Sequence, residues 1–123
     1  MLRNVGMAMF TALALSPFIS AASAHPQFKA AGPAPGSVVQ VAPKAVRIQF
    51  SEDLELAFSG IEIRNKTGEV QKTGAASLLP TDKKQLLVPV EGTLAPGMYT
   101  VNWHVVGADT HPQKGSFNFE VKP

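Results

Sequence analysis

The stretch TLAPGMYTVNWHVV, residues 93–106, decides the fold class of this chain. A proline-glycine turn signal is followed by a run in which every second side chain is apolar or aromatic, and that period of two predicts a half-buried β-strand over 98–106. Tyr99 follows the turn as in a tyrosine corner, in which the hydroxyl group bonds back to the preceding turn. We expect Trp103, on the same face of the strand, to be the central packing residue of the core.

Shorter segments of the same kind follow one another after residue 24, separated by proline and glycine, and none of them has helical periodicity. Further strands are expected over residues 46–50, 61–64, 70–73, 85–90 and 117–121. The segment 51–59 fits either an edge strand or an irregular connection. About seven short strands in one domain predict an all-β fold, a small Greek-key, immunoglobulin-like β-sandwich or barrel.

The chain opens with the features of a secretory signal peptide over residues 1–24. Arg3 precedes an apolar run over 5–19, and Ala22-Ser23-Ala24 has the small-x-small pattern of a cleavage site. The apolar run is short for a transmembrane helix, which needs about 20 residues. We therefore expect cleavage after Ala24, export to the periplasm, and a mature domain over residues 25–123 that does not insert into the membrane.

Composition excludes several kinds of partner and site. The mature domain would keep every charged residue except Arg3, and it has no basic run, which argues against a nucleic-acid partner. The chain has no cysteine, so it forms neither a disulfide nor a thiolate metal site. Met98 is the only methionine after residue 24, so no cluster of thioether ligands is expected.

The predicted cleavage point makes His25 the first residue of the mature protein. The free α-amine and the imidazole of that residue form a two-nitrogen chelate, which an internal histidine cannot offer. Pro26 has no N–H, so a metal ion bound to this chelate cannot take the next backbone nitrogen as a ligand by displacing an amide proton. The remaining ligands must therefore come from elsewhere in the fold.

Asp109 and His111 are the candidates for these ligands, because they place a carboxylate and a second imidazole in the loop before the last strand. The Asp-x-His spacing lets both side chains leave the same side of an extended segment. Three nitrogens and one oxygen without sulfur favour one Cu(II) ion per chain, with zinc as the main competitor. His104 lies on the opposite face from Trp103 and is interpreted as a surface residue.

The chain resembles the CopC family of periplasmic copper-binding proteins over nearly all of the residues after 24. The motifs that carry the resemblance are His25-Pro26, Phe50-Ser51-Glu52, Phe58-Ser59-Gly60, residues 94–103 and residues 105–117. The resemblance implies a small Greek-key sandwich and a Cu(II) site made by His25, Asp109 and His111. It also implies an acidic residue beside the site, Glu52, and a CopD-type copper transporter of the inner membrane as partner. Some members bind Cu(I) through a methionine-rich segment, and this chain resembles the type that lacks it.

Three functions stay open from sequence. The leading hypothesis is a periplasmic Cu(II) carrier or buffer in copper homeostasis or resistance, without enzymatic activity. The second is an oxidative enzyme, because an N-terminal histidine paired with a second histidine resembles the copper brace of lytic polysaccharide monooxygenases. That reading is disfavoured because Asp109 would occupy a position that such an enzyme leaves open. The third is an immunoglobulin-like accessory module without metal.

Overall fold

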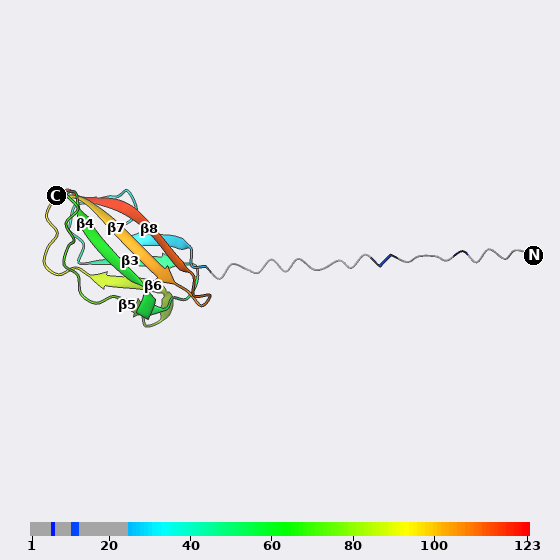
Figure 1. Cartoon of the computed structure of the whole chain (residues 1–123). Helices are drawn as coiled ribbons and strands as arrows, with labels where there is room; N and C mark the ends of the chain where they lie inside the picture. The colour runs from blue at the N-terminus through cyan, green and yellow to red at the C-terminus, as the bar shows by residue number, and fades with distance from the viewer. Residues whose placement is uncertain (1–5, 7–10, 13–24) are drawn as a thin grey trace, which may run out of the picture.

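The computed structural model describes residues 6, 11, 12 and 25–123, so nearly all of the predicted signal peptide over 1–24 lies outside the described residues. Within the described part of the chain, no helix is long and apolar enough to cross a membrane. From residue 25 onward the chain forms two four-stranded sheets that pack face to face (Figure 1). The fold is a β-sandwich, which confirms the all-β prediction and excludes the alternative of a closed barrel.

The eight strands divide between two sheets, and strands that are neighbours in the chain often lie in different sheets. Their bounds are β1 Phe28–Gly32, β2 Val38–Val39, β3 Ala45–Phe50, β4 Gly60–Asn65, β5 Ser77–Leu79, β6 Asp82–Pro89, β7 Gly97–Val106 and β8 Pro112–Val121. One sheet has the order β1-β3-β6-β5 and the other β2-β8-β7-β4. All pairs are antiparallel except β2 with β8, which is parallel. The chain therefore crosses between the sheets several times, and this brings distant segments together at each end of the sandwich.

Two segments between the strands differ in how they match the predictions. The prediction of a strand over 70–73 is wrong, because this segment makes only isolated bridges. Val70 bridges to Arg64 beside one sheet, and Thr73 bridges to Val90 beside the other. A segment that crosses from sheet to sheet cannot extend a ladder in either, and the short strand β5 pairs with β6 after the crossing. The segment 51–59 is the irregular connection, and it contains one short 3-10 helix, η1, Leu56–Phe58.

The core lies between the inner faces of the two sheets. Alternate side chains of five strands are buried in it: Val46, Ile48, Phe50, Ile61, Ile63, Leu86, Val88, Tyr99, Val101, Val105, Phe117, Phe119 and Val121. The tyrosine corner is confirmed, since the Tyr99 hydroxyl donates to the Ala95 carbonyl oxygen at 2.5 Å, and burial raises the pKa of that hydroxyl. Full burial of each large apolar side chain stabilises the fold by about 1.5–3 kcal/mol.

Trp103 does not occupy the central position expected for it. Its side chain is only partly buried, and its ring lies 5.1 Å from that of Phe50 and 6.2 Å from that of Phe28, measured between centroids. Gly115 is its partner across the β7–β8 ladder, and a Cβ atom there would collide with the indole ring. The indole ring therefore lies at the margin of the core, against these phenylalanine rings and over the space that Gly115 leaves open.

Candidate metal centre

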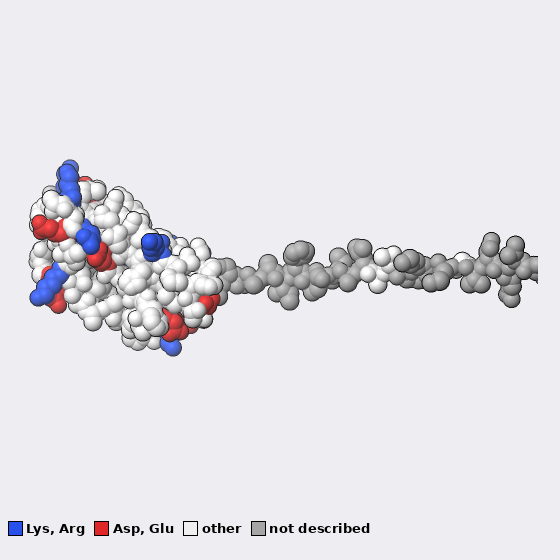
Figure 2. Space-filling view, in the orientation of Figure 1, with Lys and Arg blue, Asp and Glu red and all other residues white. Residues whose placement is uncertain are grey.

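Three chain segments meet at one end of the sandwich: the start of β1, the end of β3 and the β7–β8 loop. The start of β1 lies beside the end of β3 because these two strands run antiparallel. The Glu55 N–H, in the segment after β3, donates to the Val106 carbonyl oxygen at 2.8 Å, which places the end of β7 and the β7–β8 loop at the same end. The ring of Phe28 at the start of β1 lies 5.8 Å from that of Phe117 in β8. Figure 1 shows the β7–β8 loop beside the point where the chain enters β1. Figure 2 shows carboxylates near this end on the face in view.

The structure brings His25, Asp109 and His111 together at this end. One donor atom from each residue lies within 4.8 Å of the others. The carboxylate lies between the imidazoles: Asp109 Oδ2 contacts His25 Nδ1 and lies 3.6 Å from His111 Nδ1. The imidazole rings are 5.3 Å apart, with 47° between their planes. These are the three side chains expected from the sequence, and they form a group that could hold a metal ion.

The cluster fits a metal ion with nitrogen and oxygen ligands. Two ligand atoms that each lie about 2.0–2.1 Å from one ion are at most about 4 Å from each other. The donor atoms of the cluster lie within 4.8 Å of one another, so binding one ion requires side-chain shifts of less than about 1 Å. His111 is free to make such a shift, because 71% of its side chain is exposed, whereas only 18% of the Asp109 side chain is. The donor set of imidazole and carboxylate, with no sulfur, suits Cu(II) or Zn(II).

The β7–β8 loop positions Asp109 and His111 by a tight turn, and not by the extended segment with which the Asp-x-His spacing is also compatible. The Thr110 N–H donates to the Gly107 carbonyl oxygen at 3.1 Å, and the His111 N–H donates to Asp109 Oδ1 at 3.3 Å. Thr110 has a φ of 64°, in the left-handed region that β-branched residues rarely adopt. The hairpin reverses direction within this loop, and the strained residue lies directly between the two candidate ligands.

Replacing Thr110 by glycine is expected to raise the free energy of unfolding of the metal-free domain by up to about 1 kcal/mol. The left-handed conformation costs a non-glycine residue about 1–2 kcal/mol, and only part of the gain is lost to the greater freedom of the unfolded chain. Chemical denaturation measures the change. The matched control Thr110→Val keeps the β-branch and should stay within about 0.5 kcal/mol of the parent. A destabilised glycine variant would contradict the expectation.

Two anchors hold the segment that carries His25. Pro26 is fully buried. The next residue, Gln27, donates its N–H to Ser51 Oγ at 2.8 Å and accepts the Ser51 N–H at 2.9 Å. The sequence does not indicate this role of Ser51, because the contact depends on the pairing of β1 with β3.

Glu52 and His104 lie outside the cluster. Glu52 is exposed, and among residues 25–123 its side chain makes no ion pair, so its role beside the site stays a prediction. His104 is exposed on the outer face of β7, opposite Gly60 of β4 and Lys114 of β8, as expected for a surface residue. A Cβ atom at Gly60 would lie 2.7 Å from His104 Cε1, so the imidazole packs closely over the glycine.

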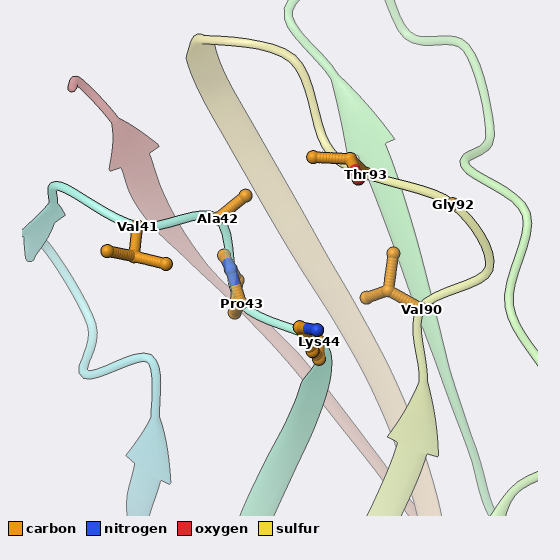
Figure 3. Close-up of a pocket in the computed structure, with 7 residues that line it drawn as sticks. All are labelled: Val41, Ala42, Pro43, Lys44, Val90, Gly92 and Thr93. Atoms are coloured by element: carbon orange, nitrogen blue, oxygen red, sulfur yellow. The ribbon is translucent and has the colours of Figure 1, made fainter.

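A hollow lies at the end of the sandwich opposite the cluster, where β3 begins and β6 ends (Figure 3). Its lining residues are Val41, Ala42, Pro43, Lys44, Val90, Gly92 and Thr93. Lys44 is the only charged residue among them, and the lining contains no histidine or carboxylate. This hollow offers no alternative metal site.

The fold and the cluster define a small β-sandwich protein with a group of nitrogen and oxygen donors at one end. Residues 28–122 match the sequence model of the CopC domain, and the chain belongs to the CopC family. This confirms the resemblance drawn from the sequence motifs. The CopC family includes copper-binding proteins of copper resistance, so copper is the metal that family membership supports for this chain.

Relatives and solved structures agree with this membership. The chain is 43% identical over 99 residues to Protein YobA of Escherichia coli K12, and the match covers 80% of each chain. The crystal structure of CopC from Methylosinus trichosporium OB3b is similar with a TM-score of 0.75 at 30% identity, covering 80% of this chain and 95% of that one. PcoC, a methionine-rich copper resistance protein from Escherichia coli, gives a TM-score of 0.72 at 32% identity, covering 80% of this chain and all of that one.

Proposed function

We propose that this protein is a periplasmic Cu(II) carrier or buffer in copper homeostasis or resistance. One Cu(II) ion is held by the α-amine and imidazole of His25, the imidazole of His111 and the carboxylate of Asp109. The observation that carries the proposal is that one donor atom from each of the three side chains lies within 4.8 Å of the others, with His25 directly after the predicted cleavage point.

The donor set favours Cu(II) over its competitors. Three nitrogens and one oxygen suit a tetragonal ion, and Cu(II) stands highest among the divalent first-row metals in affinity for such sites. An α-amine has an ordinary pKa of about 7.7–8.0, so it must release a proton to bind, and affinity falls in acid. Residues 25–123 contain a single methionine, Met98 in β7. One thioether is too few to form the sulfur-rich site that Cu(I) prefers.

The cluster favours transport or storage over oxidative chemistry. Asp109 lies between the two imidazoles and would fill a position that an oxygen-activating copper enzyme leaves open. His111 is the most exposed of the three side chains, which leaves one ligand accessible to a protein that receives or supplies the ion. By family resemblance, the proposed partner is a CopD-type copper transporter of the inner membrane.

The test is a Cu(II) titration of the mature protein, residues 25–123, followed by electron paramagnetic resonance. We expect one ion per chain and a tetragonal spectrum of three nitrogens and one oxygen. The copper-loaded protein is then incubated with chitin or cellulose and peroxide, and no chain cleavage is expected. Binding of no copper would contradict the proposal, and polymer cleavage would support the oxidative enzyme in its place.

A further inference from the structure

We infer that Ser51 is a positioning residue that holds the N-terminal arm, residues 25–27, against the end of β3, so that the imidazole of His25 faces Asp109 before copper binds. The inference rests on the proposed function, because it explains how that site is assembled. Ser51 is not a ligand and does not touch the ion; it acts through Gln27.

Hydrogen bonds to Ser51 extend the β1–β3 pairing at the start of β1. The β1–β3 ladder begins with Phe28 opposite Phe50 and shifts register directly after that pair. Beyond the ladder, the Gln27 N–H has a side-chain acceptor, Ser51 Oγ at 2.8 Å, while the Gln27 carbonyl oxygen accepts the Ser51 N–H at 2.9 Å. The backbone bond continues the pairing by one residue, and the serine hydroxyl adds a second bond by accepting the Gln27 N–H, so it strengthens the hold on the arm.

The residue between this clamp and the candidate ligand His25 is buried. Pro26 is fully buried, so its ring holds the arm by apolar contact just as Ser51 holds it by hydrogen bonds. With residues 26 and 27 both held, only His25 remains to be oriented, and its Nδ1 already contacts Asp109 Oδ2. An arm that is ordered in advance loses less conformational entropy when the ion binds, so the affinity is higher.

Ser51 is a better candidate for this role than its neighbour Glu52. The Glu52 side chain is exposed and takes part in no hydrogen bond among the described residues 25–123, whereas the Ser51 hydroxyl lies 2.8 Å from the arm. A hydroxyl is also the group that the geometry requires, since it accepts from the backbone without bringing a charge to the contact. Threonine keeps that group and alanine removes it, which provides a matched pair of variants.

The test compares Cu(II) affinity and dissociation rate for the mature protein, Ser51→Ala and Ser51→Thr. A hydrogen bond of ordinary net strength corresponds to a loss of about three- to tenfold for Ser51→Ala, expected mainly as faster dissociation. Ser51→Thr should restore most of the affinity. The paramagnetic resonance spectrum should be the same in all three proteins, because the ligands do not change. Equal affinity and equal dissociation rate for Ser51→Ala would overturn the inference.

A background without arm ligands separates positioning from general destabilisation. In a protein that carries His25→Ala and an acetylated N-terminus, the arm offers neither the amine nor the imidazole. Ser51→Ala should then leave the residual Cu(II) affinity unchanged within about twofold, since the clamp no longer orients a ligand. A loss in this background as large as in the parent would assign the effect to the whole domain and overturn the inference.

Hydrogen exchange in the metal-free protein tests the clamp without copper. The Gln27 amide should be protected in the parent and in Ser51→Thr and should exchange faster in Ser51→Ala. An unprotected Gln27 amide in the parent would overturn the inference whatever copper does. Failure of the parent to bind Cu(II) would instead contradict the proposed function, so the two failures are distinguishable.

Discussion

Acetylation of the α-amine of His25 in the mature protein is expected to weaken Cu(II) binding by at least about a hundredfold. Removing a partner that only orients a metal ligand typically costs 10–100-fold in affinity, and loss of a direct ligand should cost at least the upper end of that range. An acetylated nitrogen is an amide, whose lone pair is delocalised and whose proton copper displaces far less readily than that of an ammonium group. Pro26 offers no substitute, because its nitrogen carries no proton that copper could displace.

Acetylation is a sharper test than an added residue. A protein extended by one or two residues keeps a free amine ahead of His25, and copper could bind that amine together with the intervening backbone nitrogens. Competition titrations of the acetylated and free proteins give the affinity ratio, and paramagnetic resonance should show one nitrogen fewer after acetylation. Thermal denaturation of both metal-free proteins is the control, with less than about 0.5 kcal/mol of difference expected.

The pH dependence of binding gives a second measure of the same ligand. Between pH 8 and pH 6 the free amine becomes protonated, since its ordinary pKa is about 7.7–8.0, and copper must displace that proton. The acetylated protein carries no such proton, so its affinity should fall less steeply as the pH is lowered, by up to about tenfold less per pH unit. Equal affinities and equal slopes would show that the amine is not a ligand, and the site would then consist of side chains alone.

Local sequence predicts the parts of this fold that depend on local contacts. The alternation in β7 and the turn before Tyr99 belong to one short stretch, and the structure confirms both. The segment 70–73 has the same local character but joins two different sheets, and local sequence contains no information about which sheet a segment meets. Trp103 is a similar case, because its position depends on Gly115, which faces it only after β7 and β8 have paired.

The site shows the same division. The residue types at the cleavage point and in the Asp-x-His motif identify His25, Asp109 and His111 as a candidate set, and the fold then brings the three within reach of one ion. The features that support these three residues, by contrast, could not be predicted from residue types. The left-handed Thr110 depends on how the hairpin closes, and the Ser51 clamp depends on the pairing of β1 with β3. Neither contact follows from residue types, because both require knowing which backbone groups the ladders leave unpaired.

Replacing His111 by alanine is expected to lower Cu(II) affinity by at least about a hundredfold. Loss of a residue that only orients a ligand costs about 10–100-fold, and His111 is proposed as a ligand itself. The imidazole nitrogen Nδ1 lies 3.6 Å from Asp109 Oδ2, and 71% of the side chain is exposed. Its removal should therefore change the stability of the metal-free protein by less than about 0.5 kcal/mol, so the loss of affinity reports on the ligand alone.

His104→Ala is the matched control for this prediction. His104 and His111 belong to the same β7–β8 hairpin, so both variants remove one exposed imidazole from it. His104 lies on the outer face against Gly60 and outside the cluster, and its replacement should leave the affinity within about twofold of the parent. Competition titration measures both ratios, and paramagnetic resonance should lose one nitrogen only in the His111 variant. If His104→Ala weakens binding as much as His111→Ala does, copper does not bind in the cluster at the end of the sandwich.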